Sequence, residues 1–294
     1  MMIFGLLNIH KPPGRSSRWV VNRVNRITGV DKIGHAGTLD PLATGVLLMA
    51  LGPATRLIEY LQAGTKVYQA DIYLGVSTST YDAEGEVIST LPVPLLNRSD
   101  LEQALARFVG EIEQQPPAFS ALKVGGVAAY RKARRGQAVE LPSRRVRIEQ
   151  IELLGWQSPV LTVRVTCAPG AYIRSLACDL GQALGCGAHL TGLVRQASGH
   201  FRLEDSVHLE TLAAADDWQR FLLPPDQAVL HLTPVYLDEG RTQVVRHGNP
   251  VTATAPPPRP AGRAYDPAGR LIALVTYDAG LQMWRPDKVF DAVE

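Results

Sequence analysis

The most unusual stretch of the sequence reads GHAGTLDPLATGVLLMAL, residues 34–51. Its first twelve residues are rich in glycine and threonine and contain one acid, Asp40, between Leu39 and Pro41. The last six, Val46–Leu51, are apolar without interruption and predict a buried strand. A glycine-rich loop that leads into a strand can present one carboxylate for chemistry. An aspartate before proline also often only begins a turn, so the residues alone leave both interpretations open.

The segments around this loop show strand and helix patterns in mixed order. Strands are predicted at Gly5–Ile9, Lys66–Leu74, Val146–Leu154 and Val160–Cys167. Helices are predicted after a cap at Ser16 or Ser17, at Asp100–Gly110, and at Ile173–Leu184. Because these elements do not alternate in units of about 30 residues, the sequence favours an α+β fold. We expect a mostly antiparallel mixed sheet flanked by helices.

The length of 294 residues suggests two domains at roughly 150 residues each. The boundary is expected between Pro224 and Val229, which divides the chain into residues 1–228 and 229–294. In the second unit, strands are predicted at Gln243–Arg246 and Leu271–Tyr277, and these short strands suggest a small β-barrel.

Composition excludes several classes of protein. Hydrophobic residues make up 46% and charged residues 20% of the chain, which is typical of a folded globular protein and not of a disordered one. The three cysteines are too few and too far apart for a disulfide framework, so reduced thiols are expected. The longest apolar run is far shorter than the roughly 18 residues of a membrane span. We therefore predict a cytoplasmic protein without membrane contact.

Positive charge is concentrated in two segments although the net charge is only +2. Residues 118–147 contain eight basic residues and one acid, and residues 1–35 contain six basic residues and one acid. The rest of the chain is therefore acidic. Such separation favours a polyanionic partner, because basic clusters that neutralise phosphates release counterions.

Known cofactor and metal motifs are missing from the sequence. It contains no GxxxxGK[ST], no GxGxxG after a strand, no HExxH and no GxSxG. The seven histidines show no spacing typical of metal ligands. We therefore expect a reaction without cofactor or metal.

The loop around Asp40 resembles the signature loop of the TruB family of pseudouridine synthases, and six further motifs match that family in order. They are Lys11–Gly14 with Ser16-Ser17, Lys66–Tyr68, Tyr81–Gly85, Gln115–Pro117 with Ser120–Lys123, Gly170–Leu176 and Gly185–Leu190. The resemblance implies a pseudouridine synthase fold for residues 1–228, with an RNA-gripping insertion at about 118–147. It implies a small PUA-like RNA-binding barrel for residues 229–294.

The resemblance also implies an activity and the residues that carry it. The family converts uridine in the T-loop of tRNA, at position 55, to pseudouridine. Asp40 would attack the flipped-out uridine, after which the glycosidic bond breaks, the base rotates and C5 rejoins the sugar. Tyr68 would pack on the base and handle a proton, and Arg174 would pair with Asp40 and Asp82. A core tyrosine and a structural ion pair are the plainer interpretations of Tyr68 and Arg174.

The implied partner is the T arm of tRNA, bound by a monomer without an obligatory protein partner. His35 would fill the space vacated in the RNA loop, and Leu193 would line the pocket. The other implied substrate-binding residues are Lys11, Lys123, Arg131, Lys132, Arg134, Arg135 and Tyr172.

Three residues depart from the family's pattern: His10, Ser79 and Phe119 stand where the family often has an acid, an acid and a tyrosine. Two other functions remain open on the sequence. One is a pseudouridine synthase that depends on a guide RNA and partner proteins. The other is a non-catalytic RNA-binding or RNA-folding protein, which would need the basic segments but not Asp40.

Overall fold

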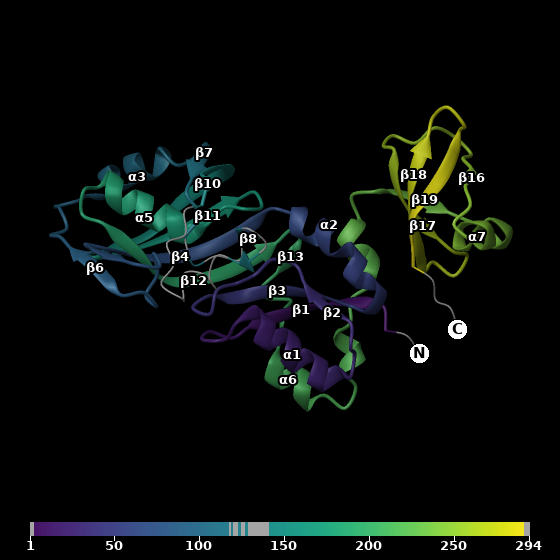
Figure 1. Ribbon diagram of the computed structural model, residues 1–294, viewed down its shortest axis with the longest axis horizontal. Coiled ribbons are helices and arrows are strands. Elements are labelled where there is room, and N and C mark those ends of the chain that lie inside the picture. Colours follow the sequence, from purple (N-terminus) through teal and green to yellow (C-terminus); the bar gives the residue numbers. More distant parts are fainter. Residues whose placement is uncertain (1–2, 118, 120–122, 125–126, 129–140, 291–294) are drawn as a thin grey trace.

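The computed structural model describes residues 3–117, 119, 123–124, 127–128 and 141–290, and Figure 1 shows them as a large sheet with helices and a smaller separate sheet. The large sheet has ten strands. They are β1 (Gly5–Lys11), β2 (Ile33–His35), β3 (Thr44–Leu51), β4 (Lys66–Leu74), β7 (Gly110–Gln114), β10 (Arg144–Gln157), β11 (Val160–Cys167), β12 (Ala188–Ser198), β13 (Phe201–Arg202) and β14 (Val207–His208).

The order of strands across the large sheet is β14-β1-β3-β12-β4-β11-β10-β7, with β2 beside β3 and β13 beside β12. Only the pairs β1–β14 and β3–β12 are parallel among these. The predicted α+β fold with a mostly antiparallel mixed sheet is confirmed. Two short hairpins stand outside the large sheet: β5 (Val76–Thr78) with β6 (Val87–Thr90), and β8 (Lys123–Val124) with β9 (Val127–Ala128).

Helices cover both faces of the large sheet. The α-helices are α1 (Ser17–Thr28), α2 (Ile58–Ala63), α3 (Arg98–Ala106), α5 (Ile173–Ala183), α6 (Leu209–Ala214) and α7 (Glu239–Arg246). The 3₁₀ helices are η1 (Gly52–Leu57), η2 (Trp218–Phe221) and η3 (Pro225–Val229). Residues of α1, α3, α5 and α6 pack on one face, and residues of η1, α2 and η3 pack on the other.

Local signals explain why the predicted helix and strand next to the site form where they do. Helix α1 begins because the Ser16 side chain accepts a hydrogen bond from the Trp19 backbone N–H, and it ends at Gly29, whose φ of 70° suits glycine. Strand β4 begins at Lys66 as predicted, and every second residue from there is buried. This alternation turns Tyr68 toward one packed face of the sheet.

Strand alternation also divides the core between the two faces. Leu47 and Met49 of β3 pack in the cluster under α1 and α5, whereas Leu48 and Ala50 pack in the cluster under α2. The second cluster includes Phe290, at the far end of the chain, whose ring lies 5.2 Å from that of Phe4. The two ends of the described chain are therefore packed together.

The smaller sheet has five strands in the order β15-β17-β18-β19-β16 and a core of its own. They are β15 (Thr233–Tyr236), β16 (Val251–Thr252), β17 (Ala261–Tyr265), β18 (Leu271–Asp278) and β19 (Met283–Val289). A PUA-like barrel fits this sheet. The division of the chain at residue 228 stays a prediction.

The strand predicted at Gln243–Arg246 is wrong, because this segment is the second half of helix α7. The Asp238 side chain caps the helix by accepting a hydrogen bond from the Arg241 backbone N–H at 2.8 Å. Thr242 and Val245, three residues apart, are the buried residues of the helix, which is helical spacing. None of the helices in the described ranges is long and apolar enough to cross a membrane.

Candidate active site

Asp40 lies on the loop between β2 and β3. The buried side chains of Ser17 and Lys11 bind the backbone of that loop. The Ser17 hydroxyl accepts a hydrogen bond from the Leu39 N–H at 2.9 Å and donates one to the Leu39 carbonyl at 3.0 Å. The Lys11 ammonium donates to the carbonyls of Pro41, at 3.2 Å, and Ala43, at 2.6 Å. These bonds lie on both sides of Asp40, so the position of its carboxylate is fixed by its neighbours.

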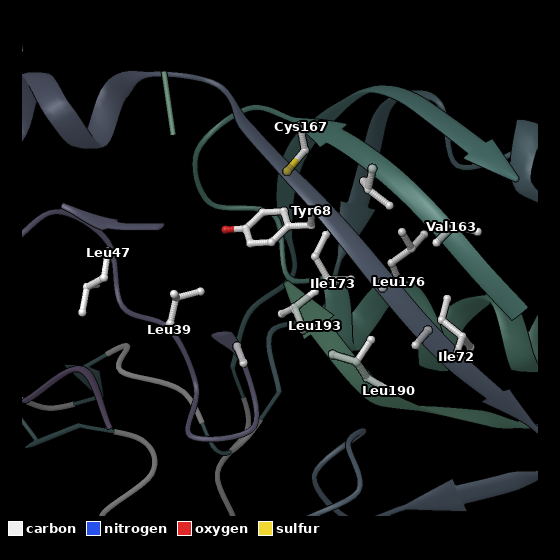
Figure 2. Packing of buried hydrophobic residues seen from close by; sticks show 14 of the residues in the cluster. Leu39, Leu47, Tyr68, Ile72, Val163, Cys167, Ile173, Leu176, Leu190 and Leu193 are labelled. Atoms are coloured by element: carbon white, nitrogen blue, oxygen red, sulfur yellow. The ribbon is translucent and has the colours of Figure 1, made fainter. Parts of the chain in front are cut away.

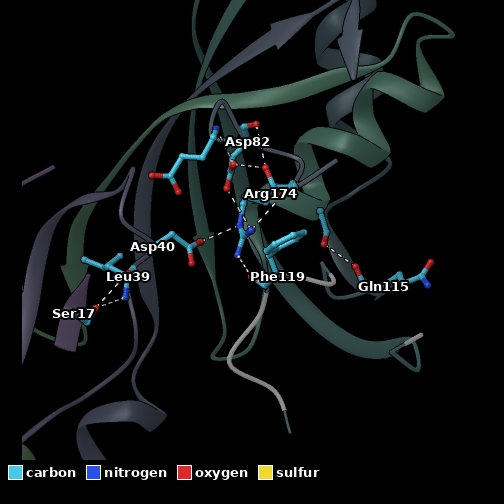
Figure 3. A network of polar contacts seen from close by, with 10 residues as sticks. Ser17, Leu39, Asp40, Asp82, Gln115, Phe119 and Arg174 are labelled. Atoms are coloured by element: carbon cyan, nitrogen blue, oxygen red, sulfur yellow. Dashed lines mark hydrogen bonds and ion pairs between the residues drawn. The ribbon is translucent and has the colours of Figure 1, made fainter. Parts of the chain in front are cut away.

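Arg174, in the first turn of α5, joins Asp40 to Asp82 (Figure 3). Its Nε lies 2.9 Å from Asp40 Oδ2, and its Nη1 lies 3.3 Å from Asp82 Oδ2. The Nε–H is not aimed at the Asp40 oxygen, so this contact is an ion pair and not a hydrogen bond. The arginine side chain is 4% exposed and that of Asp40 is 34% exposed, so the Asp40 carboxylate is accessible from solvent while its partner is enclosed.

Backbone carbonyls complete the contacts of the Arg174 guanidinium. Its Nη1 donates to the Thr80 carbonyl at 3.2 Å, and its Nη2 donates to the Phe119 carbonyl at 3.0 Å. The arrangement therefore differs from a two-pronged contact with one carboxylate, because the guanidinium forms ion pairs with two carboxylates and donates hydrogen bonds to two carbonyls. The tyrosine ring that the family often has at position 119 is not required for this contact, which uses the backbone of Phe119.

Asp82 is held in place by its own turn, in which Tyr81 has a φ of 62°. The Thr80 hydroxyl donates to Asp82 Oδ1 at 2.5 Å, and the Glu84 N–H donates to the same oxygen at 3.1 Å. The turn is attached to β12, because the Ala83 N–H donates to the Leu190 carbonyl at 2.9 Å. Asp82 is thus a rigid acceptor that orients Arg174.

Competing charges set the ionisation of Asp40. Burial raises the pKa of Asp40 above its ordinary value, and the nearby Asp82 carboxylate raises it further, while Arg174 and Lys11 lower it. Burial also raises the pKa of Glu84, followed by repulsion from Asp82 and Asp40. Arg174 and Lys11 therefore favour the charged form of Asp40.

A cavity of about 360 Å³ opens beside Asp40 and is here named the first cavity. Tyr68 and Leu193 line it together with Asp40, Tyr172 and Arg174. Figure 2 shows the Tyr68 ring at the edge of the apolar cluster, with its hydroxyl turned toward the side where Leu39 lies. Burial raises the pKa of Tyr68 and the nearby Arg195 guanidinium opposes this, so the phenol is protonated at neutral pH.

The structure brings together most of the residues singled out in the sequence. His35 is on β2, outside the lining of the first cavity, and burial together with Arg195 lowers its pKa, so its ring is neutral. The ring of Tyr172 lies under the Arg144 guanidinium at 4.6 Å. Of Lys123 only the backbone, in β8, is described. Arg131, Lys132, Arg134 and Arg135 lie outside the described residues.

Lys11 was expected to bind substrate, but its side chain is 0% exposed. Burial lowers the pKa of Lys11 to about 8, and its ammonium is directed at backbone carbonyls. This placement supports a positioning role under the loop, in place of direct contact with a substrate.

Three residues of the site received no role from the sequence, although Lys66 belongs to the Lys66–Tyr68 motif. Arg195 on β12 is 1% exposed, and it donates to the carbonyls of Val46 at 2.6 Å and Gly37 at 3.0 Å. Lys66 donates to the carbonyls of Leu61, at 3.3 Å, and Gln62, at 3.1 Å. Arg144 lines the first cavity. The only signal for Arg195 is a charge within a strand that is mostly buried, which no spacing rule detects.

Lys11→Met tests the positioning role. We expect kcat to fall by about tenfold or more while the Kd for RNA changes less than twofold, because the carbonyls of Pro41 and Ala43 lose their donor and the loop loosens. Single-turnover rates and RNA binding measure the two effects. Lys32→Met, which removes an exposed lysine, is the matched control. A higher Kd with an unchanged rate would instead show that Lys11 contacts the RNA.

Two solved structures share this fold. A chain of "Structure of H/ACA RNP bound to a substrate RNA containing 2'-deoxyuridine" is 26% identical, with a TM-score of 0.74 over 98% of this chain and 85% of that one. A chain of "Crystal Structure of a Cbf5-Nop10-Gar1 Complex" is 28% identical, with a TM-score of 0.73 over 98% and 85% of the two chains. The fold is that of the pseudouridine synthases.

Sequence comparison identifies the family within this class. Residues 25–173 match the profile of the "TruB family pseudouridylate synthase (N terminal domain)", and residues 174–230 match the "tRNA pseudouridylate synthase B C-terminal domain". A relative from Dehalococcoides mccartyi named tRNA pseudouridine synthase B is 44% identical over 97% of this chain and 96% of its own length. One of the same name from Pseudomonas aeruginosa is 41% identical over 92% and 91%. The chain belongs to the TruB family of pseudouridylate synthases.

Proposed function

We propose that this protein isomerises uridine to pseudouridine in the T-loop of tRNA, at position 55, without a cofactor and without a protein partner, as a monomer. The observation that carries the proposal is the Asp40 carboxylate, paired with a buried arginine at the mouth of the first cavity beside Tyr68. The names of the relatives that match nearly the whole chain support tRNA as the substrate.

The proposed reaction begins when the target uridine leaves the RNA stack and enters the first cavity. Asp40 attacks the nucleotide, and the bond between N1 of the base and C1′ of the sugar breaks. The base then rotates, C5 forms a new bond to C1′, and the bond to Asp40 breaks, which restores the free carboxylate. The atoms balance within the nucleotide, because the base loses one proton from C5 and gains one at N1.

Tyr68 suits the proton exchange that this balance requires. Its phenol is protonated at neutral pH, and Tyr68 lines the cavity that Asp40 also lines. A group that gives one proton to the base and takes one back from C5 ends the cycle unchanged. Leu193 and the Tyr68 ring offer apolar surface on which the flipped base packs.

Residues 1–228 form the catalytic domain in this proposal, and residues 229–294 form a PUA-like domain that binds RNA. The separate core of the smaller sheet supports this division. His35 would take the space that the flipped nucleotide leaves in the RNA loop, as the family resemblance implies.

The test is to incubate the purified chain with unmodified tRNA and map pseudouridine along it. Pseudouridine at position 55 supports the proposal, and its absence contradicts it. A bare T-arm hairpin, supplied as a second substrate, distinguishes a stand-alone enzyme from one that needs a guide RNA. Comparison with Asp40→Asn distinguishes an enzyme from a protein that only binds RNA.

The basic segment predicts a dependence on salt. Neutralising Arg134 and Arg135 together is expected to raise the Kd for tRNA and to reduce the slope of log affinity against log salt by about 1 per lost phosphate contact. The single-turnover rate at saturating tRNA should stay nearly unchanged, because phosphate contacts position the RNA and take no part in bond breaking. Binding measured at several salt concentrations tests this. An unchanged slope would place the RNA elsewhere on the protein.

A further inference from the structure

A second cavity, of about 400 Å³, lies between the large sheet and the segment that leads to the smaller sheet. Its walls come from three parts of the chain. Helix α2 contributes Tyr60 and Leu61, the turn between β12 and β13 contributes Ser198–Phe201, and the segment from η3 onward contributes Gln227 and His231. None of these residues belongs to the catalytic site described above.

Flat side chains dominate this second cavity. The rings of Tyr60 and His231 lie 6.1 Å apart at an angle of 40°, and the ring of His200 stacks on that of Phe201 at 4.1 Å and 29°. His200 and His231 are exposed residues. Aromatic and imidazole rings of this kind are the surfaces on which proteins stack unpaired RNA bases.

The two cavities share a wall. Gln62 and Lys66 line the first cavity, whereas Leu61 and Gly64, their neighbours in the sequence, line the second. The end of α2 and the turn before β4 therefore border both cavities. This adjacency supports the binding of one RNA at both cavities.

Positive charge lies next to the stacking rings. Arg259 donates to the His231 carbonyl at 3.3 Å and has no acidic partner among the described residues. The Lys288 ammonium lies 5.2 Å from the centre of the Tyr60 ring and pairs with Glu59. A cation beside a stacking surface provides a contact for the phosphate attached to a stacked base.

We propose that the second cavity binds an unpaired nucleobase of the same RNA whose target uridine enters the first cavity. The base stacks on the exposed rings of His200 and His231, and Arg259 contacts its phosphate. This inference rests on the proposed function, since it requires that the chain binds RNA.

The double variant His200→Ala with His231→Ala tests the proposal, because both residues are exposed and their removal leaves the cores intact. We expect its Kd for full-length unmodified tRNA to rise about tenfold, which is the loss expected for one stacked base. The single-turnover rate at saturating tRNA should stay within twofold of the unchanged protein. His247→Ala, an exposed histidine after α7, is the matched control and should bind tRNA like the unchanged protein.

Ultraviolet crosslinking of the unchanged protein to tRNA gives a second measurement, with crosslinks expected in peptides that contain residues 198–201 or 227–231. An unchanged Kd in the double variant overturns the proposal, and so does a change in oligomeric state without RNA, which would identify a second copy as the occupant. Pseudouridine formation by the unchanged protein is measured in the same preparation. If the unchanged protein forms pseudouridine and the double variant binds tRNA normally, only the proposal of the second site is wrong. If the unchanged protein forms no pseudouridine, the proposed function is wrong.

Discussion

Replacing Asp40 by asparagine is expected to abolish pseudouridine formation, with kcat lower by about 10⁴-fold or more, while the Kd for tRNA stays within a few fold. The amide has nearly the shape of the carboxylate but cannot act as a nucleophile. RNA affinity should persist because it depends on phosphate contacts elsewhere. Single-turnover assays and binding measured on the same preparation test both parts.

The fold should tolerate this substitution, because Arg174 keeps Asp82 and two carbonyls as partners. Asp31→Asn changes an exposed carboxylate and is the matched control, for which activity should be normal. Substantial product from purified Asp40→Asn would mean that Asp40 is not the nucleophile.

Arg174→Lys is expected to lose about 10²-fold or more of kcat. A guanidinium reaches Asp40, Asp82 and the carbonyls of Thr80 and Phe119 from three different nitrogens, whereas an ammonium has one nitrogen and cannot reach all four. Burial raises the pKa of Asp40, so poorer placement of the cation also leaves less of the carboxylate ionised. Turnover is compared at a temperature where the variant is folded.

The same variant decides between a catalytic and a structural role for Arg174. Removal of one partner from a buried ion pair typically destabilises a protein by about 3–5 kcal/mol, and lysine retains the charge, so we expect a smaller loss. Denaturant unfolding measures it. If the variant is destabilised by several kcal/mol but its folded fraction has normal activity, Arg174 serves the fold alone.

The sequence correctly predicted elements whose signals lie within the element itself or at its cap. Strand β4 was expected at Lys66–Leu74 and occurs there, because strict alternation leaves one buried face. Helix α1 begins after Ser16, whose hydroxyl caps it. Helix α7 was mistaken for a strand because two adjacent valines suggested β structure, whereas its cap and its buried residues are helical.

The largest omission was β12, the strand that joins the two halves of the large sheet. Its residues His189, Arg195 and Ser198 are polar but buried, and two register shifts interrupt its pairing with β4. No alternation in sequence marks such a strand, since its partners on both sides decide which residues are buried. Arg195 was missed for the same reason.

Some parts of the candidate site could be predicted from the sequence, and others could not. Asp40, Tyr68, Asp82 and Arg174 were named from motifs, and the structure places Arg174 against both aspartates and Tyr68 in the cavity that Asp40 lines. Their catalytic roles stay predictions. The support for the loop could not be predicted, because the carbonyls that Lys11 and Arg195 bind are identified only by the folded backbone.

Lys11 and Arg195 bind carbonyl oxygens of the loop that carries Asp40. These contacts lie inside the protein, where dissolved ions do not reach. Interactions of buried charges are screened far less by salt than those at the surface. Rising ionic strength should therefore detach the RNA long before it disturbs the geometry around Asp40. At high salt concentration the protein should show a higher KM and an unchanged maximal rate. A higher concentration of tRNA should then restore full turnover.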